Sequence, residues 1–418
     1  MGDKSLDNAP RHPSLARRSL VAWPGYHSGL AIDQLDRSVT GSIAKPLPHA
    51  LQDPRPVAEA RRLGMGVALP GQAWRNQLPL DHAKRTGMFS VLAHHRPGRQ
   101  LDPDDKRFSA TFSETYAADH LAAELGAGAT ILTTPGHVLT REGSTGREND
   151  LLLARLAAEE FSARRAAAPA PGQPAAMRRE IYATIVLQGV HARERAIVDW
   201  LINAYAALDG ISGYWIIAAN CNASGVQVAG YARLALALQA VTQRPAVVSC
   251  VGDAHLALLA SGVAATCAGV HGMSFTFPPA ELPERQDDEE ERGLGIFVYH
   301  SAVLGNVGAF TDEGERARSA LFGSAPCLCG HHPANRPPRG KRQTVSHNSW
   351  AVSRDALAFS VPAVALAEQR LDQRVQQAAR QRVLLGLSGV KTGFRSVPRV
   401  AAELRAANAP DQPGEQPG

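Results

Sequence analysis

Residues 181–189 read IYATIVLQG, an apolar run that ends in a polar residue and a glycine. Two further segments repeat this design, YWIIAANCNASG at 214–225 and AVVSCVGD at 246–253. A short, continuous apolar run bounded by turn residues is typical of a strand that is buried on both faces. Each run precedes a stretch with helical spacing, for example residues 231–241. The sequence therefore predicts strand, polar loop and helix in repeated order.

This order predicts an α/β protein with a parallel sheet. Similar units extend both ways, with a helix at 114–125 and a strand at 129–132 before the quoted runs, and a helix at 255–260 and a strand at 263–267 after them. With this many units in roughly 250 residues, a closed (β/α)8 barrel of the TIM type is favoured over an open, doubly wound sheet. No Gly-x-Gly-x-x-Gly follows an early strand, which argues against a dinucleotide-binding sheet.

The functional site of such a barrel lies at the C-terminal ends of its strands. The sequence places Gln188, Asn220, Asn222 and Asp253 there, together with the residues around Cys267. Asn and Asp also favour turns and caps for structural reasons, and a buried Cys often packs as a small apolar side chain. These residues form a candidate site whose chemistry the strand ends alone leave open.

The chain divides into four predicted regions. Residues 1–50 are rich in Pro, Arg and polar residues and predict an irregular arm. We expect the barrel at 51–325, an inserted zinc-binding loop with C-terminal helices at 326–405, and a disordered tail at 406–418.

The composition is that of a soluble globular protein, with 44% hydrophobic and 20% charged residues among 418. Five cysteines, an odd number, argue against a disulfide scaffold. The N-terminal segment lacks the apolar region of a secretory signal, and the best apolar stretch, residues 256–270, is too short to span a bilayer. We therefore expect a cytoplasmic protein with no membrane partner. The net charge of +5 permits a polyanionic partner without requiring one.

Residues 327–348 read CLCGHHPANRPPRGKRQTVSHN and contain a possible metal site. Cys327, Cys329, His332 and His347 supply four sulfur or nitrogen donors, the set that Zn²⁺ binds as a tetrahedron. A closed set of four predicts a structural ion. His331 can replace His332, and the spacing does not separate the two. The alternative is a pair of buried cysteines beside surface histidines.

The same loop carries four cations, which can face either a polyanion or solvent. They are Arg336, Arg339, Lys341 and Arg342.

This metal pattern resembles that of the tRNA-guanine transglycosylases, zinc-carrying barrel enzymes that exchange guanine for a 7-deazaguanine base. The family motif is Cys-x-Cys-x-x-Cys followed by a distant His. Cys327, Cys329 and His332 take the first three places, with His in place of the third Cys, after a shorter loop than the family's. His347-Asn348 matches the His-Asn that opens the C-terminal helix of the family.

Other segments follow in the order of that family. Residues 186–189, VLQG, resemble its Val-Gln-Gly strand end, whose Gln contacts the base; Gln188 and Gly189 stand there. Val251-Gly252 resembles its Gly-Val-Gly turn, and residues 295–298 resemble the strand that leads to the zinc loop. The resemblance covers roughly residues 80–390. It implies a structural Zn²⁺, a purine or 7-deazaguanine base as ligand, tRNA or DNA as partner, and a possible homodimer.

The departures from the family concern the catalytic carboxylates. The family links an Asp carboxylate covalently to C1′ of the ribose and expels guanine, a two-step displacement. The matching position here is Cys267. Residues 219–225, ANCNASG, replace the family's Gly-Gly-Leu-Ala-Val-Gly-Glu loop, and TTPGH at 133–137 lacks its base-contacting Asp. Asp81, in LPLDHAKRTG, is the candidate for the family's general base.

Two functions compete on this evidence. In the first, the protein is a transglycosylase-like enzyme acting on tRNA or DNA. Asp253 or Asp81 is then the nucleophile or base, and Gln188 and Asn220 hold the substrate base. In the second, a catalytically degenerate barrel retains the zinc loop and serves as a nucleic-acid-binding or scaffold protein. A lyase or aldolase barrel is a weaker third alternative, because no lysine at an expected strand end suits a Schiff base.

Overall fold

The computed structural model describes most of the chain. The described residues are 19–23, 32–71, 110–139, 144–167, 179–219, 225–249, 251, 254–269, 298–307 and 312–386. The statements below concern these ranges.

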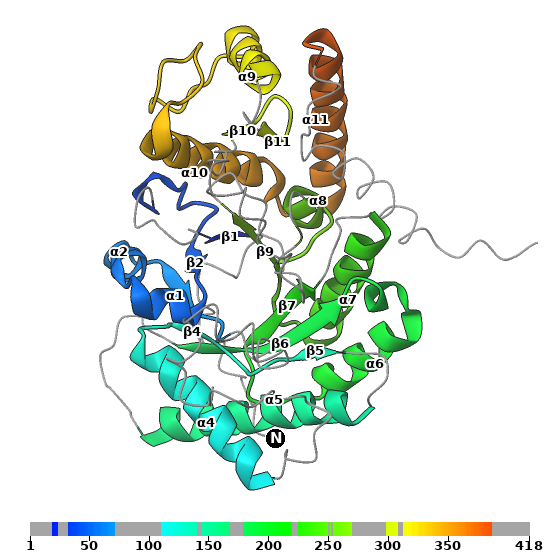
Figure 1. Cartoon of the computed structure of the whole chain (residues 1–418). Coiled ribbons are helices and arrows are strands. Elements are labelled where there is room, and N and C mark those ends of the chain that lie inside the picture. Colours follow the sequence, from blue (N-terminus) through cyan, green and yellow to red (C-terminus); the bar gives the residue numbers. More distant parts are fainter. Residues whose placement is uncertain are drawn as a thin grey trace, which may run out of the picture.

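A closed barrel of eight parallel strands forms the centre of the protein (Figure 1). Its strands are β1 (Ser19–Trp23), β2 (Ser42–Ala44), β3 (Gly66–Ala68), β4 (Ile131–Thr133), β6 (Glu180–Gln188), β7 (Gly213–Ala219), β8 (Ala246–Ser249) and β9 (Ala265–Gly269). Every strand pairs in parallel with its neighbours, and the pairings of β4 with β6 and of β9 with β1 close the ring. The predicted (β/α)8 barrel is confirmed.

The fourth barrel position is an interrupted strand. The short β5 (Val138–Leu139) pairs with the C-terminal part of β6, along the same edge that β4 occupies further back. Between them, a Cβ at Gly136 would lie 2.6 Å from Thr184 Cγ2, so a larger residue would collide with β6. The missing side chain lets the chain pass close to β6 at this break.

Helices cover the outside of the barrel. They are α1 (Leu47–Gln52) and α2 (Arg55–Arg62) after β2, α4 (Ala110–Gly126) after β3, α5 (Ser144–Ala167) after β5, α6 (Arg195–Ala206) after β6, α7 (Gly225–Thr242) after β7 and α8 (His255–Ala260) after β8. Single 3₁₀ turns, η1 (Ile32–Gln34) and η5 (His191–Arg193), lie in the loops. None of the helices in the described ranges has the length and apolar character needed to cross a membrane.

The apolar core has two layers, as expected for a barrel: one inside the ring of strands and one between the strands and the surrounding helices. Side chains alternate along each strand, so every second one faces the interior. Ile181 packs in the outer layer with Leu121 of α4 and Ala157 of α5. Trp215 is 1% exposed and meets Tyr182 edge-on at a ring separation of 6.4 Å, inside the barrel.

The predicted irregular arm over residues 1–50 is wrong, because two barrel strands lie within it. Residues 19–23 and 42–44 form β1 and β2, and β1 joins β9 to complete the ring. Leu20, Val21, Ala22 and Ile43 are completely buried. The strands are short, which is why the Pro and Arg residues around them dominated the composition.

The predicted end of the barrel domain at residue 325 is also wrong. After β9, β10 (Val298–His300) and β11 (Gly305–Val307) form a separate antiparallel hairpin, followed by α9 (Asp312–Ser324), α10 (Gly340–Phe359) and α11 (Val364–Leu384). We define the metal subdomain as residues 298–307 and 312–350. Beyond it, Ala351, Ala356 and Phe359 of α10 join the main core.

Candidate metal centre and barrel mouth

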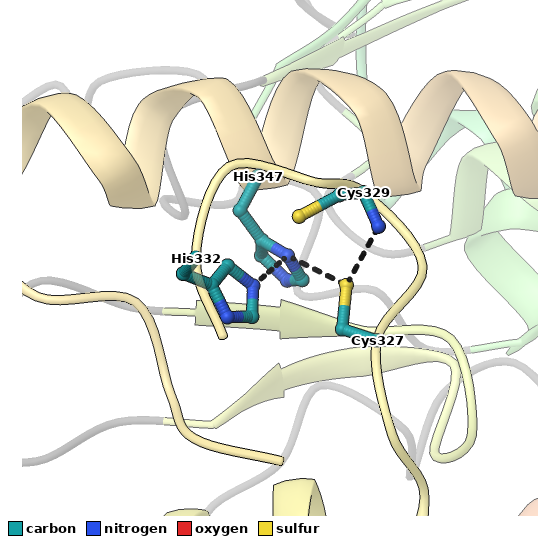
Figure 2. A group of neighbouring side chains, drawn as sticks. All are labelled: Cys327, Cys329, His332 and His347. Atoms are coloured by element: carbon teal, nitrogen blue, oxygen red, sulfur yellow. Dashed lines mark hydrogen bonds between the residues drawn. The ribbon is translucent and has the colours of Figure 1, made fainter. Parts of the chain in front are cut away.

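Four side chains converge at the centre of the metal subdomain (Figure 2). Cys327, Cys329 and His332 come from the loop after α9, and His347 comes from the second turn of α10. One ligand atom from each lies within 4.8 Å of all the others. Cys329, His332 and His347 are buried, and Cys327 is half-buried. This cluster could hold a metal ion, as the sequence predicted.

The distances within the cluster fit a tetrahedral ion. His332 Nε2 lies 3.0 Å from His347 Nδ1, and Cys327 Sγ lies 3.3 Å from the same nitrogen. Bonds of about 2.0–2.1 Å to nitrogen and about 2.3 Å to sulfur separate two nitrogens by about 3.3 Å and a sulfur from a nitrogen by about 3.6 Å. The two nitrogens and Cys327 Sγ therefore need to move apart by only a few tenths of an ångström to accept such an ion.

Each histidine is oriented by its second ring nitrogen. His347 Nε2–H donates to the backbone oxygen of Tyr299 at 2.6 Å, and His332 Nδ1–H donates to that of Pro333 at 2.9 Å. With these bonds made, His347 Nδ1 and His332 Nε2 face each other and the cysteines. A backbone carbonyl behind a ligating histidine is the arrangement that usually fixes its tautomer in metal sites.

The alternative between His331 and His332 is decided in favour of His332. The His331 ring does not belong to the cluster. Its backbone N–H donates to Cys329 Sγ at 3.4 Å, and Cys329 N–H donates to Cys327 Sγ at 3.3 Å. Gly330, at φ +73°, supplies the left-handed turn between the second cysteine and the histidines. The loop is thus folded around the sulfurs by its own backbone.

The hydrogen bonds within the cluster also shift the pKa values of its residues. The pKa of Cys329 is lowered, first by the hydrogen bond from the Cys327 thiol and then by those from His332 and His347. The Cys327 thiol is the donor, and its pKa is raised. Burial acts to lower the pKa of His332, but its hydrogen bond to Cys329 and the charge of that sulfur raise it overall. A sulfur held as thiolate by surrounding protons is one that a metal cation can take over.

Asn348 adds a second connection from α10 to the hairpin. Its Oδ1 accepts the backbone N–H of Tyr299 at 2.9 Å, while the neighbouring His347 binds the carbonyl of the same residue. The Tyr299 hydroxyl donates to buried Asp355 at 2.7 Å, and Arg374 of α11 donates to that carboxylate at 3.1 Å. Sequence reasoning missed Tyr299, Asp355 and Arg374, and no spacing rule connects them to the metal ligands.

Phe322 of α9 forms the apolar side of the centre. Its ring lies 5.3 Å from that of His332, 5.5 Å from that of His347 and 4.5 Å from that of His300. His300 is buried, and burial together with the charge of His347 lowers its pKa to about 4. His300 is therefore neutral at physiological pH.

The structure describes only some of the residues that were predicted to lie at the barrel mouth. Gln188 and Gly189 end β6, and the alternation along β6 directs Gln188 to the interior. A Cβ at Gly189 would lie 2.5 Å from Oε1 of the buried Gln227, so this glycine lets the α7 side chain approach the strand end. Four predicted site residues lie outside the described residues: Asp81, Asn220, Asn222 and Asp253.

Cys267 is an interior residue of β9. It is 1% exposed, and burial raises its pKa well above the ordinary value. Its neighbour Thr266 contacts His255 of α8 on the outside, so Cys267 faces the barrel interior. A thiol in this setting stays protonated and is a poor nucleophile. Cys267 packs as a small apolar side chain.

A strand-end lysine was missed, because the arm was expected to be irregular. Lys45 directly follows β2 and is completely buried. Its Nζ donates to the Asp53 backbone oxygen at 3.0 Å and lies 3.9 Å from the Asp53 carboxylate. Burial lowers its pKa. Because this amine is already engaged, it gives the aldolase alternative no support.

The predicted phosphate-binding cations lie at the surface of the metal subdomain. Arg336 is in the metal loop, residues 325–339 between α9 and α10. Arg339 is the N-cap residue of α10, and Arg342 lies in the first turn of that helix; all three are exposed. The backbone of Lys341 lies in the same turn. Residues 336–342 therefore present at least three solvated guanidinium groups within one short segment.

Comparison with known proteins adds no assignment. No protein-family model matches the chain, and a search of curated proteins also found no match.

Proposed function

We propose that the metal centre holds one structural Zn²⁺. Two sulfur and two nitrogen donors form the set that Zn²⁺ prefers, and a closed set of four leaves no position for a substrate. The orientation of His332 and His347 by backbone carbonyls supports this proposal. Metal analysis of the purified protein should give about one zinc per chain. A content well under half an equivalent, with no effect of chelators, would contradict it.

We further propose that the metal subdomain binds tRNA or DNA. The observation that supports this is the exposure of Arg336, Arg339 and Arg342, which lie along the chain between the candidate ligands His332 and His347. Guanidinium groups bind phosphate oxygens strongly, and a fixed loop loses little entropy on binding.

Salt dependence tests this interface. Replacing Arg336, Arg339, Lys341 and Arg342 by Ala should weaken binding and flatten its dependence on salt, by about 0.7–0.9 in the log–log slope for each phosphate that is no longer neutralised. A control for the loss of positive charge is the double variant Arg370→Ala and Arg380→Ala on α11, which removes two cations at another place. If the quadruple variant keeps its affinity and slope for tRNA and for duplex DNA, the nucleic acid does not bind at this loop.

The reaction that we propose is base exchange, or a related N-glycosyl transfer, at the barrel mouth. Gln188 offers both a donor and an acceptor to a purine-like edge, as the resemblance to the transglycosylases implies. Asn220 and Asn222 would contact the same base, and Asp81 or Asp253 would supply the carboxylate that attacks C1′ or moves the proton. The roles proposed for Asn220, Asn222, Asp81 and Asp253 rest on the sequence pattern.

A catalytically degenerate binding protein is the second candidate. The burial of Cys267, at the position where the family has its nucleophilic Asp, favours it. Incubation with tRNA or DNA and labelled guanine or a 7-deazaguanine separates the two. An enzyme should incorporate label and lose incorporation in Gln188→Ala with binding retained. A scaffold should bind the polymer with no incorporation in any variant.

A further inference from the structure

A cleft of about 420 Å³ lies between the metal subdomain and α11. One wall is the hairpin turn with Ser301 and Ala302, and a second is the segment ahead of Cys327, which includes Pro326. The third wall is a face of α11 that carries Arg374 and Gln377, with Gln381 one turn further. Figure 1 shows the hairpin between α9 and α11. None of the lining residues that the structure describes belongs to a barrel strand.

Arg374 is fixed in the cleft by one of its three nitrogens. Its Nη2 donates to the Ser301 backbone oxygen at 2.9 Å and to Asp355 at 3.1 Å. Nη1 and Nε have no partner among the residues that the structure describes, and the side chain is 36% exposed. A guanidinium has five N–H donors, so this one still offers three to a ligand without needing to be ordered first.

The electrostatics of the cleft favour an anion. Arg374 is the charged residue of its described lining, and no acidic residue accompanies it there. Asp355 lies behind the guanidinium at 5% side-chain exposure and also accepts the Tyr299 hydroxyl. His300 at the cleft edge is neutral, because both of its ring nitrogens are engaged by backbone groups.

The remaining lining combines amide groups with small apolar side chains. Gln377 is exposed and has no hydrogen-bond partner in the described part of the chain. Gln381 Nε2 donates to Ser324 at 3.1 Å, which leaves its oxygen and one N–H free. Ala302 and Pro326 supply small apolar surfaces against which a planar ring can lie.

We propose that this cleft binds a nucleotide. Arg374 would receive the phosphate, the amides of Gln377 and Gln381 would meet the donor and acceptor edge of the base, and Pro326 would contact its face. A bare phosphate would leave most of the 420 Å³ unfilled, whereas ligand pockets for small molecules start at about 300 Å³. A free mononucleotide and an unpaired nucleotide within a nucleic-acid chain share this chemistry. The inference goes beyond the proposed base exchange, because it needs neither the barrel mouth nor a reaction.

Calorimetry on the full, metal-loaded chain tests the site. The probes are GMP, UMP, guanosine and inorganic phosphate. The variant is Gln377→Glu, a nearly isosteric change at an exposed position that adds a negative charge beside the phosphate site. The matched control is Gln376→Glu, which places the same charge on the adjacent face of α11, outside the cleft lining. GMP and UMP should bind the wild type, and Gln377→Glu should weaken both about fivefold or more. The control should change neither by more than about twofold, and guanosine should be weaker than GMP.

A short single-stranded RNA distinguishes the two sources of the nucleotide. If the site serves a nucleic-acid chain, the RNA should displace GMP, and Gln377→Glu should weaken that displacement. If it serves free nucleotides, GMP should stay bound while RNA binds elsewhere. The proposal is overturned if neither GMP nor UMP binds up to about 10 mM, a ΔG weaker than about −3 kcal/mol. It is equally overturned if Gln377→Glu and Gln376→Glu have the same effect.

Discussion

The barrel and the metal subdomain reach a folded state by different means. The barrel belongs to one continuous core of buried apolar side chains that runs through its interior and under α6, α7 and α8. The metal subdomain has a smaller cluster of its own around Val303, Val307 and Leu321, and Val298, Phe322 and Val345 are also buried among its described residues.

The difference shows what the buried polar groups of the subdomain are for. Its interior holds the four candidate ligands and Asn348, and the hydrogen bonds from Tyr299 to Asp355 and from Arg374 to Asp355 connect it to the C-terminal half of α10 and to α11. If the centre holds Zn²⁺, as we propose, metal binding supplies part of the folding free energy of the subdomain, as it does in zinc fingers. The barrel needs no such help, so changes at the metal centre should separate the two regions.

Loss of one ligand should have the largest effect. Cys329→Ser removes a sulfur from the closed set, and structural Zn²⁺ sites carry about 10–16 kcal/mol of binding free energy. We expect metal content to fall from about one to below about 0.2 per chain and the subdomain to unfold at physiological temperature. Metal analysis together with limited proteolysis, read by mass, measures both.

Cys267→Ser is the matched control for this experiment. It makes the same sulfur-to-oxygen change at a fully buried site of the barrel. It should lower barrel stability by about 1–3 kcal/mol and leave the metal content at about one. Equal metal loss in both variants would mean that the loss does not depend on Cys329 as a ligand.

A core change should affect the regions in the opposite way. Trp215→Ala removes a side chain that is 1% exposed inside the barrel. Such deletions cost about 3–5 kcal/mol. Chemical unfolding of the barrel should shift by this amount, whereas the metal content should not change. Release of metal by this variant in the absence of denaturant would show that the two regions fold as one unit.

Asn348→Ala should have a smaller effect, confined to the subdomain. It leaves the buried N–H of Tyr299 without its acceptor, which costs about 1–3 kcal/mol. Zinc should still bind, but a competing chelator should remove it at a lower concentration. Asn335→Ala, an exposed asparagine in the metal loop, should behave as the wild type.

The smallest expected effect is a pH dependence from His300. Its pKa is about 4 in the folded protein, below the ordinary value of 6.5. The unfolded chain therefore binds the proton first as pH falls, and this part of the stability is present above about pH 6.5 and lost progressively toward pH 4. Between pH 8 and pH 6 the loss is about 1 kcal/mol. With zinc in excess, the subdomain of His300→Asn should lose less stability over this range than that of the wild type. Parallel pH curves would remove His300 as the cause.

Features that depend on residues close together in the sequence were predicted best. The runs at 181–187 and 214–218 lie within β6 and β7, because a strand buried on both faces is apolar throughout. The ligands of the metal centre were also predictable, since they depend on side-chain type and short spacing. The strands β1 and β2 were missed, because five and three residues carry too little periodicity to stand out among prolines.

The surroundings of the metal centre could not be predicted for a different reason. Tyr299 and Asp355 are 56 positions apart in the sequence, and Asp355 and Arg374 are 19 positions apart. Only the folded chain brings the three together. Arg374 also looked like an ordinary surface cation, because an isolated helix sequence does not reveal which face meets a cleft. Contacts of this kind depend on tertiary structure alone.

Hydrogen exchange with and without zinc tests the central claim most directly. The full chain is compared before and after removal of the ion by a chelator, with peptides that cover the barrel and the subdomain. The account predicts that amides at 298–307 and 312–350 lose protection, while those of β6, β7 and β8 keep theirs. Unchanged protection of the subdomain after metal removal, or loss of protection throughout the barrel, would contradict it.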